Sequence, residues 1–81
     1  MIHSKDIWGV IQAKISRERW VSLEELYEVV EEYGNLDTDD FKPQSPTSDI
    51  PKWKRNVRNV LQYRKSTGEI QWNREARYLL P

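Results

Sequence analysis

The segment Pro51–Lys65, PKWKRNVRNVLQYRK, decides the fold. Its apolar side chains recur at helical spacing and predict a helix with one buried face: Trp53, Val57, Val60 and Leu61. Every other position except Tyr63 and the leading proline carries a basic group or an amide, and the segment contains no carboxylate. A helix face that is merely solvated usually mixes both signs of charge. The segment therefore predicts a helix that presents a cationic, amide-rich face.

Downstream of this helix the pattern changes from helical spacing to alternation. Ser66, Thr67 and Gly68 end the helix, and residues 69–72 alternate polar and apolar side chains as a half-buried strand does. Residues 73–76 form a turn, and residues 77–80 predict a second strand. The C-terminal part is thus expected to be a helix followed by a two-stranded hairpin.

Two further helices are predicted upstream. The first covers residues 5–15, with Ser4 as its N-cap, and a short extended piece follows at Trp20 and Val21. The second covers residues 23–33, because Ser22 and Glu25 form a reciprocal capping box and Gly34 ends the apolar stripe.

Between the second and third helices, residues 35–49 lack any period. They hold prolines, aspartates and hydroxyl residues and are expected to form a loop that Leu36 and Phe41 pin to the body. Ser48 or Asp49 is the expected cap of the third helix, with Pro51 in its first turn.

Length and composition exclude several classes of protein. The 81 residues form one domain, residues 1–81, and a chain of this size buries only about 60% of its unfolded surface. The absence of cysteine removes disulfides and thiolate sites and fits a reducing cytoplasm. A single histidine, His3, cannot supply a histidine-rich metal site or a catalytic triad. No apolar run approaches the roughly 20 residues of a membrane span, and no phosphate-cradling glycine loop is present.

The neutral net charge hides a strong asymmetry. Residues 1–50 contain 5 Lys or Arg against 11 Asp or Glu, a net charge of −6, whereas residues 51–81 contain 8 against 2, a net charge of +6. A chain sorted in this way has a positive end that can attract a polyanion. The alternative reading is that the two halves attract each other within the fold.

The C-terminal third also carries a family resemblance. It reads P-x-W-x-R-x-V-R-x-x-L-Q-x-x-R-x-x-G-x-I-x-W from Pro51 to Trp72, followed by Arg77-Tyr78-Leu79. This pattern resembles the winged-helix domains of modification-dependent restriction endonucleases, especially those that read methyladenine in GATC, and similar modules fused to HNH nucleases. The turn Asn73–Ala76 stands where that family usually has a glycine-rich wing turn. The resemblance implies an α+β, mostly α fold, a winged helix-turn-helix of three helices and a C-terminal two-stranded wing.

The implied function is non-catalytic reading of double-stranded DNA in the major groove. The resemblance further implies a short palindromic site containing 6-methyladenine, and a fused or associated nuclease domain. No cofactor, metal, membrane or small-molecule substrate is expected. Because Asn and Gln pair with adenine and Arg with guanine, and because the methyl group needs an apolar contact, the expected base or methyl contacts are Pro51, Trp53, Arg55, Asn56, Arg58, Asn59 and Gln62. The expected DNA backbone contacts are Ser48, Lys52, Lys54, Lys65, Arg74 and Arg77.

Each assignment has a structural alternative. Trp53 heads the apolar stripe and could belong to the core, and Arg58 could bridge to the acidic second helix. Gln62 and Asn56 could be surface amides without a role. At the level of function, the alternative is a protein-interaction module in which the acidic helix or the third helix docks a partner. Binding to structured RNA is a third reading.

Overall fold

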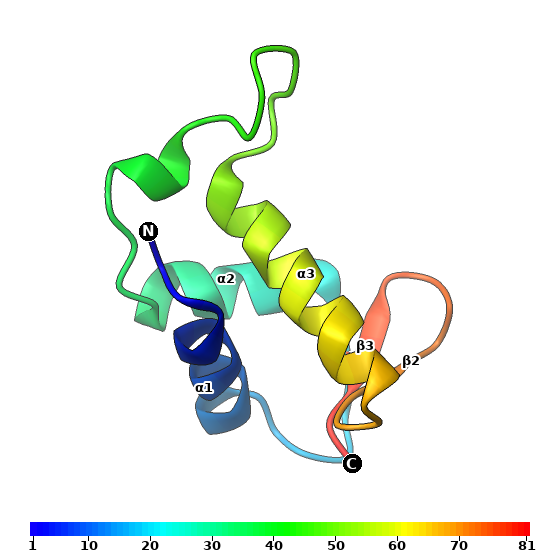
Figure 1. The fold of residues 1–81 in the computed structure, drawn as a ribbon. Coiled ribbons are helices and arrows are strands. Elements are labelled where there is room, and N and C mark those ends of the chain that lie inside the picture. Colours follow the sequence, from blue (N-terminus) through cyan, green and yellow to red (C-terminus); the bar gives the residue numbers. More distant parts are fainter.

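The computed structural model describes all residues, 1–81, as three helices and a small antiparallel sheet (Figure 1). The elements in chain order are α1 (Ser4–Lys14), β1 (Trp20–Ser22), α2 (Leu23–Tyr33), the 3-10 turn η1 (Asp39–Phe41), α3 (Lys52–Ser66), β2 (Gln71–Trp72) and β3 (Arg77–Leu79). Most of the regular structure is helical. None of the helices combines the length and the apolar composition that crossing a bilayer requires.

The sheet has three strands, where the sequence predicts a two-stranded wing. Its order is β1-β3-β2, and both neighbours of β3 are antiparallel to it. Tyr78 of β3 lies between Val21 of β1 and Trp72 of β2. The extended piece before α2 therefore supplies a third strand from a distant part of the chain. This arrangement of three helices and a sheet is compatible with a winged helix.

The core lies where the three helices meet the sheet. Fifteen buried apolar residues form one cluster, in which each helix contributes its apolar stripe. Ile7 and Ile11 of α1, Leu26 of α2 and Leu61 of α3 are completely buried. Burial of such side chains stabilises by about 1.5–3 kcal/mol each relative to exposure, so these stripes fix how the helices pack.

The caps of α1 and α3 differ from expectation. His3, not Ser4, caps α1, because its Nδ1 accepts a hydrogen bond of 3.2 Å from the Lys5 amide; the helix therefore starts and ends one residue earlier than predicted. Pro51 is the extended N-cap residue of α3 and lies outside the helix. No side chain caps α3. Instead, the Lys52 amide donates to the Lys42 carbonyl at 2.9 Å.

The bounds predicted for α2 are confirmed. Its Ser22 Oγ accepts from the Glu25 amide at 3.1 Å, but the Glu25 carboxylate pairs with Arg19, so the expected reciprocal bond of the capping box is not made. Gly34 ends α2 with a φ of −78°, in an extended conformation. A Cβ at that position would lie 2.4 Å from the Val30 carbonyl oxygen, which is why a glycine is needed there.

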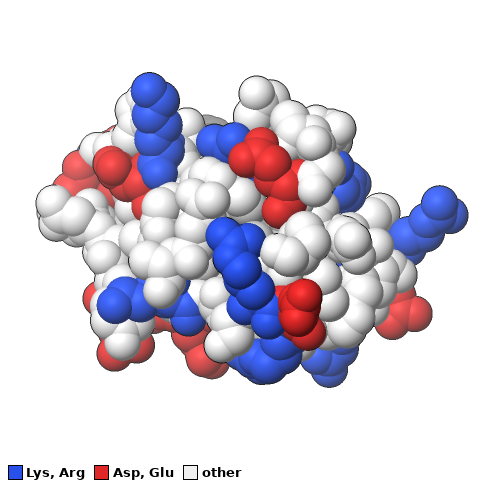
Figure 2. All heavy atoms as spheres, turned by 90° about the horizontal axis from the view of Figure 1, so that it is seen from below, with Lys and Arg blue, Asp and Glu red and all other residues white.

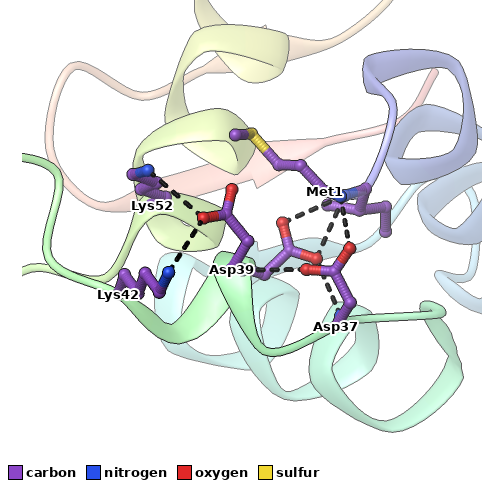
Figure 3. Close-up of polar contacts among 7 residues, drawn as sticks. Met1, Asp37, Asp39, Lys42 and Lys52 are labelled. Carbon is purple, nitrogen blue, oxygen red and sulfur yellow. Dashed lines mark hydrogen bonds and ion pairs between the residues drawn. The ribbon is translucent and has the colours of Figure 1, made fainter.

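The loop after α2 is fixed by two aspartates, as Figure 3 shows. The completely buried Asp40 carboxylate accepts from the Ile2 amide at 2.9 Å and from the Asp37 amide at 2.9 Å. Asp37 in turn accepts from the Asp40 amide at 3.0 Å and pairs with the Met1 amino group. The sequence gives no sign of this network, whereas the expected contact of Phe41 is present against Trp53, with ring centroids 6.5 Å apart.

Candidate nucleic-acid interface

The outward face of α3 is the main candidate site. Trp53, Val57, Val60 and Leu61 turn inward and are buried, which leaves the opposite side of the helix to solvent. Its four central side chains are all exposed: Arg55, Arg58, Asn59 and Gln62. None of them takes part in a salt bridge. We name these four residues the α3 face. The helix buries its apolar stripe and keeps its cationic and amide groups available.

A depression of about 160 Å³ lies between the α3 face and the preceding loop. It is lined by the whole α3 face together with two loop residues, Gln44 and Ile50. Arg55 Nη1 donates a hydrogen bond of 2.6 Å to Gln44 Oε1, so the loop touches the side chain directly. The sequence analysis missed both loop residues, because residues 35–49 carry no periodic signal that would place them beside α3.

Arg58 stands near two tyrosines and makes no salt bridge with the acidic helix α2. Burial raises the pKa of Tyr27 in α2 and of Tyr78 in β3, and the positive charge of Arg58 opposes that rise in both. The only α2 glutamate in a salt bridge is Glu25, whose partner is Arg19. Arg58 therefore does not bridge to the glutamates of α2. It lies near Tyr27 of α2 and Tyr78 of β3 and remains exposed.

Trp53 cannot serve as the expected methyl contact. Only 2% of it is exposed, and its ring packs edge-on against Tyr27 with centroids 5.7 Å apart. It is a core residue because it heads the buried stripe of α3. Pro51 and Asn56, the other two expected contacts, are half-buried. Asn56 lines a larger cavity of about 580 Å³ between α3 and the N-terminal residues, and Asn59 of the α3 face lines the same cavity.

The expected backbone-contact residues of α3 fall into two groups. Lys52 Nζ lies 3.6 Å from the Asp39 carboxylate, and that carboxylate also faces Lys42 (Figure 3). Lys54 lies over the Tyr27 ring at 5.1 Å, and Lys65 over the Trp72 ring at 4.2 Å, without an acidic partner. Stacking on a ring leaves the charge unneutralised, so Lys54 and Lys65 remain able to meet a phosphate. Ser48, an expected backbone contact in the preceding loop, uses its Oγ to accept a hydrogen bond of 3.1 Å from the Ile50 amide.

The turn between β2 and β3 is held rigid without glycine. Asn73 Oδ1 accepts from the amides of Glu75 and Arg77 at 2.8 and 3.2 Å, and Trp72 Nε1 donates to the Glu75 carbonyl at 2.6 Å. Arg74 adopts a left-handed conformation with a φ of 69° at this turn. A non-glycine residue there is uncommon, and the surrounding hydrogen bonds offset its cost.

The structure separates Arg77 from the α3 face. Arg77 pairs with Ser22, so the alternation of strand side chains puts it on the sheet face opposite the buried Val21. That face does not pack on the helices. Of the two wing arginines, Arg74 is the one at the turn, and Arg77 projects from the other side of the sheet.

The face of the molecule seen in Figure 2 mixes both signs of charge. Figure 2 views the molecule from below Figure 1, and basic and acidic side chains alternate there between wide uncharged areas. The C-terminal end of α3 also meets an acid: Arg64 Nη1 forms hydrogen bonds of 2.8 and 3.0 Å with the Glu69 carboxylate.

No group of three or more His, Cys, Asp or Glu side chains is placed to hold a metal ion.

No protein-family model, curated protein or solved structure matches the chain.

Proposed function

We propose that this chain is a non-catalytic, winged-helix module that binds double-stranded DNA, with α3 in the major groove. The observation that carries the proposal is the α3 face: two arginines, an asparagine and a glutamine, all exposed, on a helix of 15 residues without a carboxylate. A major groove about 12 Å wide admits a helix of this kind. The buried stripe anchors the helix to the body, so the face is presented on a rigid element.

The side chains of the α3 face match the groups that base edges offer. Arg55 and Arg58 have the fork of donors that pairs with guanine O6 and N7, and Asn59 and Gln62 can both donate to and accept from adenine. Lys54, Lys65 and Arg74 have no acidic partner and would contact phosphates. A palindromic site would seat two copies of the module.

The resemblance to restriction-associated winged helices extends the proposal to preference for 6-methyladenine and to targeting of a nuclease. With Trp53 buried, the apolar contact for that methyl group would have to come from the start of α3, where Pro51 is half-buried. This finer proposal is tested with one palindromic duplex, methylated or not, in a gel shift. Equal affinity for the two forms would refute it and leave DNA binding intact.

Binding of DNA itself is tested by titration across a range of salt. A module with several phosphate contacts loses affinity steeply as salt rises, because it must release condensed counterions. Arg58→Ala or Gln62→Ala should cost roughly 1–3 kcal/mol on the preferred duplex and relax the preference at one position. An equal loss on preferred and random duplexes would show that the two side chains touch only phosphates. Undetectable binding of the wild-type chain at low salt would refute the proposal.

A protein-docking function is the alternative, and the outer face of α2 is the observation that favours it. Glu24, Glu28, Glu31 and Glu32 are exposed there and form no salt bridge, so they are open to a basic partner. Replacing Glu28 and Glu32 by Gln separates the two functions. The change should leave DNA affinity unchanged or slightly higher, and it should abolish binding of a basic partner that uses this face.

A further inference from the structure

The loop between η1 and α3 leaves the body and returns to almost the same place. The Lys52 amide donates to the Lys42 carbonyl at 2.9 Å, the Gln44 amide to the Ile50 carbonyl at 3.1 Å, and Pro43 and Pro51 form an antiparallel bridge. Figure 1 shows this loop projecting beyond the N-terminal end of α3. We name residues 43–51 the α3 loop. Its base is tied to the start of the helix, so its position is coupled to that of the α3 face.

Within the α3 loop, further hydrogen bonds hold the segment that returns to α3. The Ser48 amide donates to the Ser45 carbonyl at 3.2 Å, and Ser48 Oγ accepts from the Ile50 amide at 3.1 Å. These bonds order the residues that lead to Ile50. A long segment without a period is therefore a folded projection next to α3, with defined places for its side chains.

Gln44 sets the direction of one arginine. Its Oε1 accepts from Arg55 Nη1 at 2.6 Å, which uses one of the five guanidinium donors and leaves the others available. Bidentate pairing with guanine requires the plane of the guanidinium to be correctly oriented, and a long exposed side chain otherwise samples many rotamers. A fixed acceptor on a second element removes part of that freedom before binding.

Ile50 adds an apolar surface to a depression that is otherwise polar. It is 38% exposed and is the only hydrophobic residue among the six that line the depression with the α3 face. In the major groove the apolar group of unmodified DNA is the C5 methyl of thymine. An aliphatic side chain beside arginines and amides therefore has one natural partner in that groove.

We infer that the α3 loop is part of the base-reading surface, in which Gln44 is a positioning residue for Arg55 and Ile50 contacts a thymine methyl group. The inference rests on the proposed function, because it names further residues of the same DNA-binding site. It assigns the loop a role in specificity that α3 alone does not account for.

The first experiment tests Gln44 through sequence preference. A library of duplexes with randomised central bases is used to find the preferred duplex of the wild-type chain, and affinities for it and for a random duplex are then compared. Gln44→Met should lower the ratio of the two affinities by roughly three- to tenfold and leave affinity for the random duplex unchanged. In an Arg55→Ala background the same change should have little further effect.

Two further variants separate positioning from folding and from charge. Gln44→Glu retains an oxygen acceptor for Arg55, so it should keep the preference ratio while weakening binding to every duplex through charge repulsion. Gln12→Ala removes a different exposed glutamine, on α1, and should change neither affinity. Thermal unfolding of each variant shows whether the fold is retained.

The second experiment tests Ile50 with the DNA as the variable. Replacing single thymines of the preferred duplex by deoxyuridine removes only the methyl group. At the one thymine that Ile50 contacts, the replacement should weaken binding of the wild-type chain by about fourfold, which corresponds to the burial of one methyl group. Ile50→Ala should be insensitive to that replacement, and Ile50→Leu should restore sensitivity.

The outcomes distinguish failure of this inference from failure of the proposed function. If the wild-type chain does not bind duplex DNA, both are overturned. If it binds with a preference that Gln44→Met leaves intact, or with no sensitivity to any thymine methyl group, the corresponding role of the α3 loop is overturned and DNA binding stands. Binding without any sequence preference also overturns the inference alone.

Discussion

Two adjacent aspartates show how far the role of a residue depends on burial. Asp40 is completely buried and accepts the amides of Ile2 and Asp37, whereas Asp39 is partly exposed and faces Lys42 and Lys52 at 3.7 and 3.6 Å. Exposed salt bridges such as those of Asp39 contribute little to stability, because solvent screens them. Loss of a buried acceptor leaves its donors unsatisfied.

We therefore expect Asp40→Ala to lower the free energy of unfolding by about 1–3 kcal/mol, because two backbone amides lose their partner. The matched change Asp39→Ala should alter it by about 0.5 kcal/mol or less. Urea denaturation followed by circular dichroism measures both values. An equally small loss of unfolding free energy in both variants would show that the buried amides find other partners.

At the scale of the elements, α2 has an N-cap that a single substitution can test. Ser22 Oγ accepts from the Glu25 amide at 3.1 Å, and Ser22 also belongs to β1, so the cap joins the sheet to the helix. Ser22→Ala should destabilise the fold by about 1 kcal/mol, the usual effect of losing a cap. Ser4→Ala is the control, because His3 and not Ser4 caps α1. Equal effects in thermal unfolding would contradict the assignment of both caps.

Local patterns in the sequence predict helices well and long-range pairs poorly. The bounds of α2 follow from a cap, an apolar stripe and a terminal glycine, all between Ser22 and Gly34. The pairing of β1 with β3 joins Val21 to Tyr78, and no local pattern specifies such a partner. The burial of Asp40 is likewise set by tertiary contacts and leaves no periodic signal.

The same division holds for the candidate site. The α3 face could be predicted, because helical spacing alone separates Arg55, Arg58, Asn59 and Gln62 from the buried stripe. For Trp53 the sequence allows either a methyl contact or a place in the core, and its packing against Tyr27 shows that it belongs to the core. Gln44 and Ile50 could not be placed, since their position depends on how the α3 loop folds back.

At the scale of the whole molecule, two exposed carboxylates give the fold a sensitivity to acid. Thr67 and Arg64 lower the pKa of Glu69 from its ordinary value of 4.5, and hydrogen bonds from the Met1 amino group and the Asp40 amide lower the pKa of Asp37. A carboxylate with a lowered pKa in the folded state stabilises above its unfolded value. That stabilisation is lost as pH falls through the folded value.

The melting temperature should therefore fall as pH drops below about 4.5. Glu69→Gln should melt below the wild-type chain at neutral pH, and the difference should shrink in acid, where the wild-type carboxylate is also neutral. Glu28→Gln, at an exposed position without a salt-bridge partner, is the control and should show no such pH-dependent difference. A gap between Glu69→Gln and wild type that is constant with pH would contradict the proposed linkage.

Net charge cannot draw this molecule to a polyanion, since Lys and Arg are balanced by Asp and Glu at 13 each. Attraction must come from the sorting of charge, and part of it is already neutralised: Lys52 faces Asp39 and Arg64 faces Glu69. Outside α1 and the segment that follows it, the cations without a salt bridge are those of the α3 face together with Lys54, Lys65, Arg74 and Arg77, and Arg77 lies on the other side of the sheet. The number of phosphates that they neutralise sets the dependence of binding on salt.

With three to five such contacts, affinity for a duplex should fall on the order of a hundredfold between about 50 and 200 mM salt. Lys65→Gln should reduce the slope of log affinity against log salt by about 0.9, because one phosphate contact is lost. Lys14→Gln is the matched control: Lys14 is in α1 and lies over the Tyr33 ring at 4.4 Å, far along the chain from α3. Its slope should equal that of the wild-type chain, and a reduction as large as that of Lys65→Gln would mean that DNA is attracted by the whole surface and not by α3.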